Sequence, residues 1–236
     1  YVDLHLHTNH SDGTDSPARV VERAAELGIA ALAIADHDTV SGVEEARKAA
    51  AAHGIEFLPA TEVSSSFNNM EVHVVGLGVD AQAEVLKEAL ERQRQGRLHR
   101  ADRIIEKLHA LGVPVCPHRI AARTANGSIG RMHIAQEIHE LGYATTVQDA
   151  FDKYIGKGQK AFVRKPAMSC ESAIRLIREA GGVAILAHPG IGTVYRALDR
   201  VLRLPFDGIE AYHCKHSPGQ VEQFTQLAQE RGYLIS

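Results

Sequence analysis

The start of the chain alternates between apolar and polar residues. Aliphatic side chains in the segment 2–7 alternate with Asp3, His5 and His7, so a β-strand places the aliphatic groups on one face and the polar groups on the other. The two histidines then point to the same side. A single histidine is more often structural, but a His-x-His pair on one strand aims two imidazoles at one point and favours a metal site.

Short apolar runs bounded by turn residues predict further strands, with helical patterns between most of them. Together with the first, seven strands are expected, at residues 2–7, 29–35, 55–60, 71–77, 183–187, 208–211 and 233–236. Ser41 and Glu44 have the spacing of a capping box at the start of the second helix. This alternation predicts an α/β fold with a parallel, barrel-like sheet.

The pattern changes between residues 82 and 165, where helical stretches rich in charge replace the strands. We expect 82–165 to be a helical insertion domain, and 1–81 and 166–236 to form the barrel together. The expected insertion carries 15 Lys and Arg against 9 Asp and Glu, whereas the rest of the chain carries 11 against 20. An acidic barrel attracts cations and a basic insertion attracts anions, which suits a metal site acting on phosphate. Basic helical surfaces are also common, so charge alone leaves both interpretations open.

Composition narrows the class of protein. With 44% hydrophobic and 23% charged residues, the chain can bury a core, and its net charge of −3 provides no global field for nucleic acid or a membrane. No apolar run approaches the roughly 20 residues that span a bilayer. The three cysteines are far apart, and Tyr1 leads directly into the first strand without a leader pattern, so a cytoplasmic location is expected. Nothing in the sequence indicates an obligate protein partner.

Several of the 14 histidines, together with two acidic residues, lie where parallel barrels build active sites, which is at the carboxyl ends of strands. His37 or Glu62 alone would pass as a structural or solvated residue, and Asp12 alone as a turn residue. Together they exceed the ligands that one zinc ion needs, which predicts two or three metal ions bridged by a carboxylate. The candidate residues are His5, His7, Asp12, His37, Glu62, His73 and His188.

The segments around these residues resemble the successive motifs of the PHP (polymerase and histidinol phosphatase) family. The matching segments are 3–8, 11–13, 35–39, Glu62, 72–78 and 187–189. The resemblance implies a distorted (β/α)7 barrel with a trinuclear site of divalent metal ions, in which manganese is the first choice and iron or zinc are alternatives. It also implies that the seven candidate residues are metal ligands and that Glu62 is a bridge. The family pattern closes with Gly-Ser-Asp-x-His, and we expect the chain to continue into it beyond Ser236.

The segment 130–135 resembles the Arg-x-His-hydrophobic-Ala motif of small PHP phosphoesterases that act on nucleotides, which implies that Arg131 and His133 hold substrate phosphate. A guanidinium fork suits phosphate oxygens. Positions i and i+2 diverge by about 200° around a helix, so both reach one phosphate only at a helix start. Gly130 makes such a start possible.

The implied activity is hydrolysis of nucleoside 3′,5′-bisphosphates or short 5′-phosphorylated RNA by a metal-activated water. The substrate would then be a small phosphorylated molecule. Two alternatives remain from the same resemblance: a histidinol-phosphate phosphatase, and a degenerate PHP domain whose metal site is structural.

Two groups of basic residues stay outside this assignment. Arg97, Arg100 and Arg103 recur every three residues and could guide a nucleic-acid backbone, but we favour a solvated helix face. His213 and His216 follow the sixth strand and could contact phosphate or support the metal site; neither is assigned.

Overall fold

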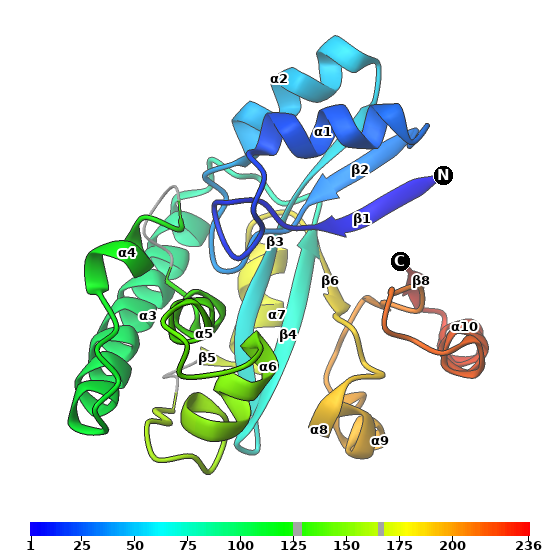
Figure 1. Cartoon of the computed structure of the whole chain (residues 1–236). Helices are drawn as coiled ribbons and strands as arrows, with labels where there is room; N and C mark the ends of the chain where they lie inside the picture. The colour runs from blue at the N-terminus through cyan, green and yellow to red at the C-terminus, as the bar shows by residue number, and fades with distance from the viewer. Residues whose placement is uncertain (125–128, 165–167) are drawn as a thin grey trace.

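A curved mixed sheet forms the centre of the computed structural model, which describes residues 1–124, 129–164 and 168–236 (Figure 1). Its strands are β1 (Val2–Leu6), β2 (Ala31–Ile34), β3 (Glu56–Phe67), β4 (Met70–Leu77), β5 (Met168–Ser169), β6 (Val183–Leu186), β7 (Gly208–Ile209) and β8 (Leu234–Ile235). They pair in the order β1-β2-β3-β4-β6-β7-β8, and the short β5 pairs with β3. The seven expected strands are therefore confirmed, and β5 is an addition.

The expectation of a wholly parallel sheet is wrong at β4, which runs antiparallel to both β3 and β6. Asn68 and Asn69 form the link between β3 and β4, and both have positive φ, of 46° and 65°. A two-residue link of this kind returns the chain directly as an antiparallel hairpin. β3 also continues to Phe67 instead of ending near residue 60, so residues 61–67 are part of this hairpin.

Helices surround the sheet, with several gathered beside β3 and β4. They are α1 (Pro17–Glu26), α2 (Val43–His53), α3 (Glu84–Ala110), α4 (Pro117–Ala121), α5 (Arg131–Glu140), α6 (Val147–Ala150), the π-helix η1 (Phe151–Ile155), α7 (Cys170–Glu179), α8 (Gly192–Arg196), α9 (Leu198–Val201) and α10 (Pro218–Arg231). The capping box expected at Ser41 is wrong, because the cap of α2 is Gly42 without a side-chain bond. The Ser41 hydroxyl instead lies 2.6 Å from His10 Nδ1. None of the described helices combines the length and apolar character needed to cross a membrane.

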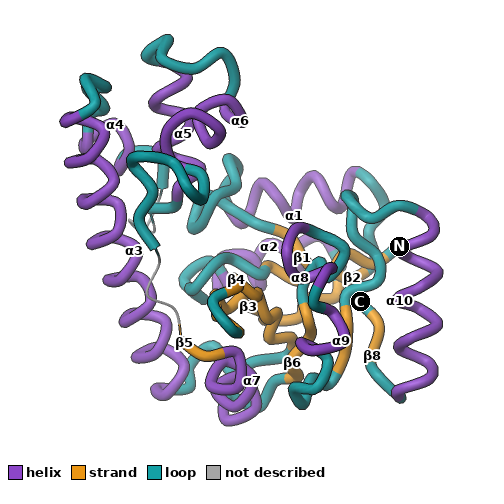
Figure 2. Tube along the Cα trace, turned by 90° about the horizontal axis from the view of Figure 1, so that it is seen from below, coloured by secondary structure: helices purple, strands orange, loops and turns teal. Residues whose placement is uncertain are grey.

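The structure has two large hydrophobic clusters, and they are formed by different parts of the chain. One joins β3, β4, β6, α7 and α10, and it includes Leu86 and Leu90 from the first half of α3. The other contains only residues between 101 and 163, from the second half of α3 to the segment after η1. Figure 2 shows α3 extending from beside α7 to the group formed by α4, α5 and α6. The expected boundary between residues 165 and 166 lies outside the described residues.

A smaller cluster of apolar side chains supports the inner face of the sheet. It includes Ala33 of β2, Ala60 of β3, Val75 of β4 and Ile185 of β6. Side chains two residues apart on a strand share a face, so Glu62 lies on the same face as Ala60, and His73 on the same face as Val75. The sheet therefore presents these two polar side chains directly above a small apolar core.

Candidate metal centre

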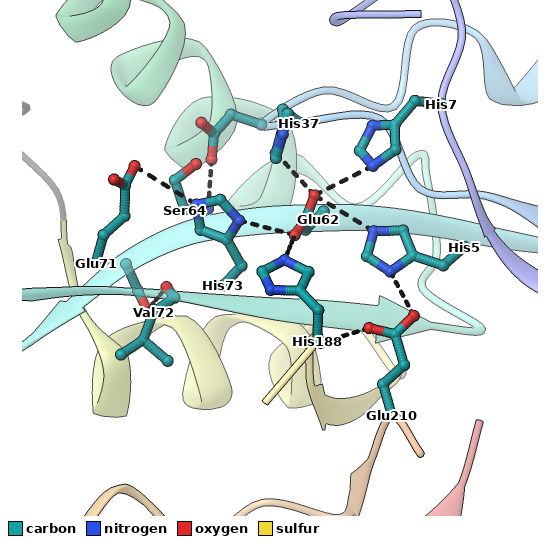
Figure 3. A network of polar contacts seen from close by, with 12 residues as sticks. His5, His7, His37, Glu62, Ser64, Glu71, Val72, His73, His188 and Glu210 are labelled. Atoms are coloured by element: carbon teal, nitrogen blue, oxygen red, sulfur yellow. Dashed lines mark hydrogen bonds and ion pairs between the residues drawn. The ribbon is translucent and has the colours of Figure 1, made fainter. Parts of the chain in front are cut away.

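The carboxylate of Glu62 lies at the centre of the site, and Glu62 is only 1% exposed. Figure 3 shows imidazoles from several strands and loops converging on it. The distances to its two oxygens are 2.8 Å from His37 Nδ1, 2.8 Å from His73 Nδ1, 2.9 Å from His188 Nε2, and 3.3 Å from both His5 Nε2 and His7 Nε2. Sequence reasoning placed Glu62 beyond a strand, whereas it lies within β3.

Asp12 provides a second carboxylate beside this group. Its oxygens lie 3.4 Å from His7 Nδ1 and 3.7 Å from His37 Nε2, so these two rings stand between Asp12 and Glu62. All seven candidate residues are thus brought together. Three sets of potential ligand atoms each lie within 4.8 Å of one another, namely His5, His7 and Glu62; His7, Asp12 and His37; and His37, Glu62 and His73. The sets share His7, His37 and Glu62.

Burial and charge compete at these groups. Burial alone lowers the pKa of His5, but the carboxylates of Glu210 and Glu62 outweigh it and raise the pKa to about 10. The pKa of His73 rises to about 9 because Glu62 and Glu71 likewise outweigh burial. Burial raises the pKa of Glu62, yet the surrounding imidazoles, His37 and His73 first among them, hold it well below its usual value. The carboxylate is therefore ionised and strongly attracts positive charge.

The donor atoms fit divalent transition metals. Imidazole nitrogen and carboxylate oxygen are the ligands that manganese, iron and zinc accept in proteins. Three buried ring nitrogens face carboxylate oxygens without hydrogen-bond geometry within the described residues: His5 Nε2 and His37 Nδ1 lie 3.3 and 2.8 Å from Glu62, and His73 Nε2 lies 3.5 Å from Glu71. A bound cation would satisfy these nitrogens.

Glu210 supports the site and was missed by sequence reasoning. It is buried, lies directly after β7, and its Oε1 is 2.9 Å from His5 Nδ1. Its other oxygen accepts a hydrogen bond from the backbone N–H of His188. A carboxylate that accepts from Nδ1 leaves Nε2 free to bind a metal. The available signal was its position at a strand end, which it shares with the other candidates.

Asp36 supports the loop that follows β1. The Asp36 carboxylate accepts hydrogen bonds from the backbone N–H of Thr8 at 2.7 Å, from its hydroxyl at 2.6 Å, and from the Ser11 hydroxyl. The Ser11 hydroxyl also lies 3.1 Å from His7 Nδ1. Asp36 thus holds the turn that carries His7 and Asp12, a role that sequence reasoning did not assign.

The expectation of a solvated arginine face on α3 is wrong for two of its three residues. Arg97 is largely buried and its guanidinium lies 2.6 Å from the buried carboxylate of Asp38. Arg100 is buried and its Nε donates to the carbonyl of Val163 at 2.9 Å. Arg103 is exposed, as expected. Of the three arginines, Arg97 therefore faces the sheet and Arg103 faces solvent.

Arg131 and His133 lie at the same cavity as the candidate metal ligands. The cavity has a volume of about 150 Å³, and its walls include Asp12, His37 and His73 as well as these two residues. We call it the metal-side cavity. Its lining also includes Arg97 and Arg100.

The helix start expected at Gly130 is confirmed, because α5 begins at Arg131 with Gly130 as its cap. The backbone N–H of Gly130 donates to His133 Nδ1 at 3.1 Å, so Nε2 carries the ring proton. That Nε2 is buried and has no hydrogen-bond partner within the described residues. Arg131 and His133 can therefore both present donors to one anion.

The two unassigned histidines differ in their contacts. The His213 ring lies 5.7 Å from the His188 ring and 6.4 Å from the His5 ring, between centroids. His216 Nδ1 lies 2.9 Å from the carbonyl oxygen of Ala211, which ties this ring to the backbone. Of the two, His213 lies beside the candidate metal ligands.

Known proteins resemble this chain over nearly its whole length. A 3′,5′-nucleoside bisphosphate phosphatase of Chromobacterium violaceum is 36% identical over 241 aligned positions, which cover all of this chain and 85% of that protein. The 5′-3′ exoribonuclease Rnm of Escherichia coli is 33% identical, over 97% of this chain and 80% of that enzyme.

Solved structures share the fold. An amidohydrolase from Chromobacterium violaceum, with bound sulfate and no metal, matches with a TM-score of 0.91 at 34% identity, over 99% of this chain and 84% of that one. A protein of Bifidobacterium adolescentis with the provisional description of a metal-dependent phosphoesterase matches with a TM-score of 0.89 at 31% identity, over 100% of this chain and 85% of that one. The family model for the PHP domain matches residues 3–110. With this fold, these relatives and these motifs, the chain belongs to the PHP family.

Proposed function

We propose that the protein is a metal-dependent phosphoesterase whose ions are held by His5, His7, Asp12, His37, Glu62, His73 and His188. The observation that carries the proposal is the buried carboxylate of Glu62 with five imidazoles around it. Two or three ions, manganese first, suit the overlapping sets of donor atoms. Its location is expected to be cytoplasmic, because the three cysteines are free and thiols stay reduced in that compartment.

Phosphate esters resist hydrolysis because their anionic oxygens repel nucleophiles. Bound divalent ions supply positive charge next to the phosphate and lower the pKa of water, so that a nucleophile is present near neutral pH. The chain itself contributes Arg131 and the Nε2–H of His133, which reach the metal-side cavity from the start of α5. Their role is to hold the phosphate oxygens and to stabilise the charge that develops on them.

The proposed substrates are nucleoside 3′,5′-bisphosphates and short 5′-phosphorylated RNA. Support comes from the activities named for the two relatives and from the arginines at the cavity. A compact anionic substrate suits a cavity lined by Arg97, Arg100 and Arg131.

The test is phosphate release from adenosine 3′,5′-bisphosphate by the manganese-loaded protein, with histidinol phosphate as the competing substrate. We expect turnover of the bisphosphate and loss of turnover in His7→Ala. A preference for histidinol phosphate contradicts the nucleotide assignment. Bound metal without hydrolysis of either ester indicates instead a structural metal site.

A further inference from the structure

The loop after β6 carries His188, one of the candidate metal ligands, in an unusual backbone conformation. The φ angle of His188 is +30°, in the left-handed region that residues other than glycine seldom adopt. The next residue is Pro189, whose ring further restricts the backbone of the residue before it. Such a conformation persists only where surrounding contacts hold it. Contacts with this loop are therefore needed to keep the His188 ring in place.

The first part of the loop is held beside the candidate metal centre. The backbone N–H of His188 donates to Glu210, and His188 Nε2 lies 2.9 Å from Glu62 (Figure 3). The backbone N–H of Ile191 donates to the His188 carbonyl at 3.1 Å, which closes residues 188–191 as a β-turn. Gly190 lies inside this turn, and these contacts do not involve it.

The start of α10 binds Gly190 through both of its backbone polar groups. The Gly190 N–H donates to His216 Nε2 at 3.2 Å, and the Gly190 carbonyl accepts from Gln220 Nε2 at 3.0 Å. The two side chains come from 26 and 30 positions further along the chain. We call His216 and Gln220 the α10 clamp. The clamp joins the loop of the candidate ligand to a helix that has no candidate ligand of its own.

Each side chain of the α10 clamp is itself fixed. His216 Nδ1 donates to the carbonyl of Ala211 at 2.9 Å, so the ring proton is on Nδ1 and Nε2 is an acceptor. The His216 ring also packs edge-on against Phe224, with 5.1 Å between the ring centroids. Gln220 Oε1 accepts from the backbone N–H of Ser217 at 2.9 Å, within the capping box of α10. The clamp is therefore held in its binding geometry by α10 and by the segment after β7.

The fit between the clamp and the loop requires a glycine. A Cβ atom on Gly190 would lie 2.7 Å from His216 Cδ2 and 2.8 Å from Gln220 Nε2, which is closer than such atoms normally approach. Glycine therefore permits a close contact between the backbone and the two side chains. Because Gly190 is only two residues after His188, this contact limits the movement of the candidate ligand.

We propose that His216 and Gln220 are positioning residues for His188, and that the α10 clamp sets the affinity for the ion that His188 binds. The proposal rests on the proposed function, which makes His188 a metal ligand, and adds the contacts that hold this ligand in place. Both side chains act through the backbone of Gly190 and not on the ion itself. Partners that orient a metal ligand typically account for about 10- to 100-fold in metal affinity.

The experiment compares Gln220→Glu with the wild-type protein. Glutamate keeps an acceptor for the Ser217 N–H, so the capping box of α10 remains, but it has no N–H for the Gly190 carbonyl. We expect manganese to bind about 10-fold or more weakly in a competition titration against a chelator. Gln229→Glu is the matched control, because it adds the same charge at an exposed position of the same helix. Its manganese affinity should equal that of the wild type.

A second variant reaches the same contact from the other side chain. His216→Phe keeps an aromatic ring to pack against Phe224 but removes the acceptor for the Gly190 N–H. We expect a loss of manganese affinity similar to that of Gln220→Glu. Wild-type affinity in both variants overturns the proposal. If Gln220→Glu does not fold, which circular dichroism detects, His216→Phe decides the question.

Histidine NMR gives a readout that does not depend on metal. In the metal-free protein with ¹⁵N-labelled histidine, the ring nitrogen signals of His188, assigned with His188→Asn, should shift in Gln220→Glu and stay in place in Gln229→Glu. Unchanged His188 signals in both clamp variants overturn the positioning role. Wild-type protein that binds no manganese contradicts the proposed function instead, and the His188 signals then decide the positioning role separately.

Discussion

At the residue scale, the geometry of the site depends on two buried carboxylates with different tasks. Both oxygens of Glu62 face the imidazoles. Glu210 binds Nδ1 of His5, the ring nitrogen that points away from Glu62. A buried carboxylate is costly unless positive charge or hydrogen-bond donors surround it. Both residues meet that condition within the described chain, and both pKa values lie below the ordinary value for glutamate.

Removing the charge of Glu62 tests the centre of the site. Glu62→Gln keeps the shape of the side chain but removes the negative charge that faces five imidazoles, so we expect loss of bound manganese and at least about 100-fold slower hydrolysis. Elemental analysis of the purified variant measures the metal. Glu91→Gln on the exposed side of α3 is the control. Unchanged metal content in Glu62→Gln contradicts the assignment.

Glu210 acts through His5, as a positioning residue. Its two oxygens accept from His5 Nδ1–H and from the His188 backbone N–H, whereas an amide offers only one acceptor oxygen. Glu210→Gln should therefore weaken manganese binding by about 10- to 100-fold in a competition titration. Glu210→Asp retains two acceptors and should restore part of the affinity. Equal affinity in the wild type and the Gln variant is the result that rules out this role.

At the element scale, α3 connects the barrel with the residues around α4, α5 and α6. Its first half packs in the cluster of the sheet, and its second half packs in the cluster of residues 101–163. Between them, Arg97 pairs with Asp38 and donates to the Ser64 hydroxyl at 2.9 Å. This buried ion pair ties the middle of α3 to the segment after β2 and to β3.

Breaking that pair should destabilise the protein. Arg97→Ala removes the cation that faces the buried Asp38 carboxylate, and we expect the free energy of unfolding to fall by about 3 kcal/mol in urea titration. Arg92→Ala on the same helix breaks only an exposed pair with Glu88 and should change it by less than about 0.5 kcal/mol. If both variants lose the same amount, the buried pair has no special contribution.

At the scale of the whole molecule, the second hydrophobic cluster supports a helical insertion between the two parts of the barrel, because it draws all its buried members from residues 101–163. The first cluster draws on both flanking parts of the chain and also on Leu86 and Leu90, so the start of α3 packs with the sheet although it lies within the proposed insertion 82–165. The proposed insertion supplies Arg97, Arg100, Arg131 and His133 to a cavity that Asp12, His37 and His73 of the proposed barrel also line. The acidic and basic parts of the chain thus meet at the site.

Metal binding should stabilise the whole fold, because ligands of one ion come from widely separated strands. A ligand at about 100 times its Kd adds about 2.7 kcal/mol, which for a chain of this size corresponds to roughly 5 to 10 °C in Tm. We expect chelation to lower the Tm and manganese to restore it. Glu62→Gln should show no response to manganese. A Tm shift of the same size in that variant would place the stabilising ion elsewhere.

The local sequence pattern determined where most of the strands lie and which side chains could carry the chemistry. Alternation of apolar and polar residues and short apolar runs depend only on neighbouring residues, so they located seven strands and the helix start at Gly130. The types of side chain at strand ends determined the chemistry, because imidazoles and carboxylates in that number have few other uses. The family resemblance rested on the same short segments.

The tertiary structure decided the rest. The burial of Glu62 and the contact of Arg97 with Asp38 depend on how strands and helices pack, which no local pattern specifies. The antiparallel direction of β4 follows from the extension of β3 to Phe67, which leaves only two residues before β4 begins. His5 and Glu210 are 205 residues apart, so their contact exists only once both ends of the sheet are in register. The sequence by itself specified which groups could bind ions and phosphate; folding specified which of them meet, because distance in space is set by packing and not by position along the chain.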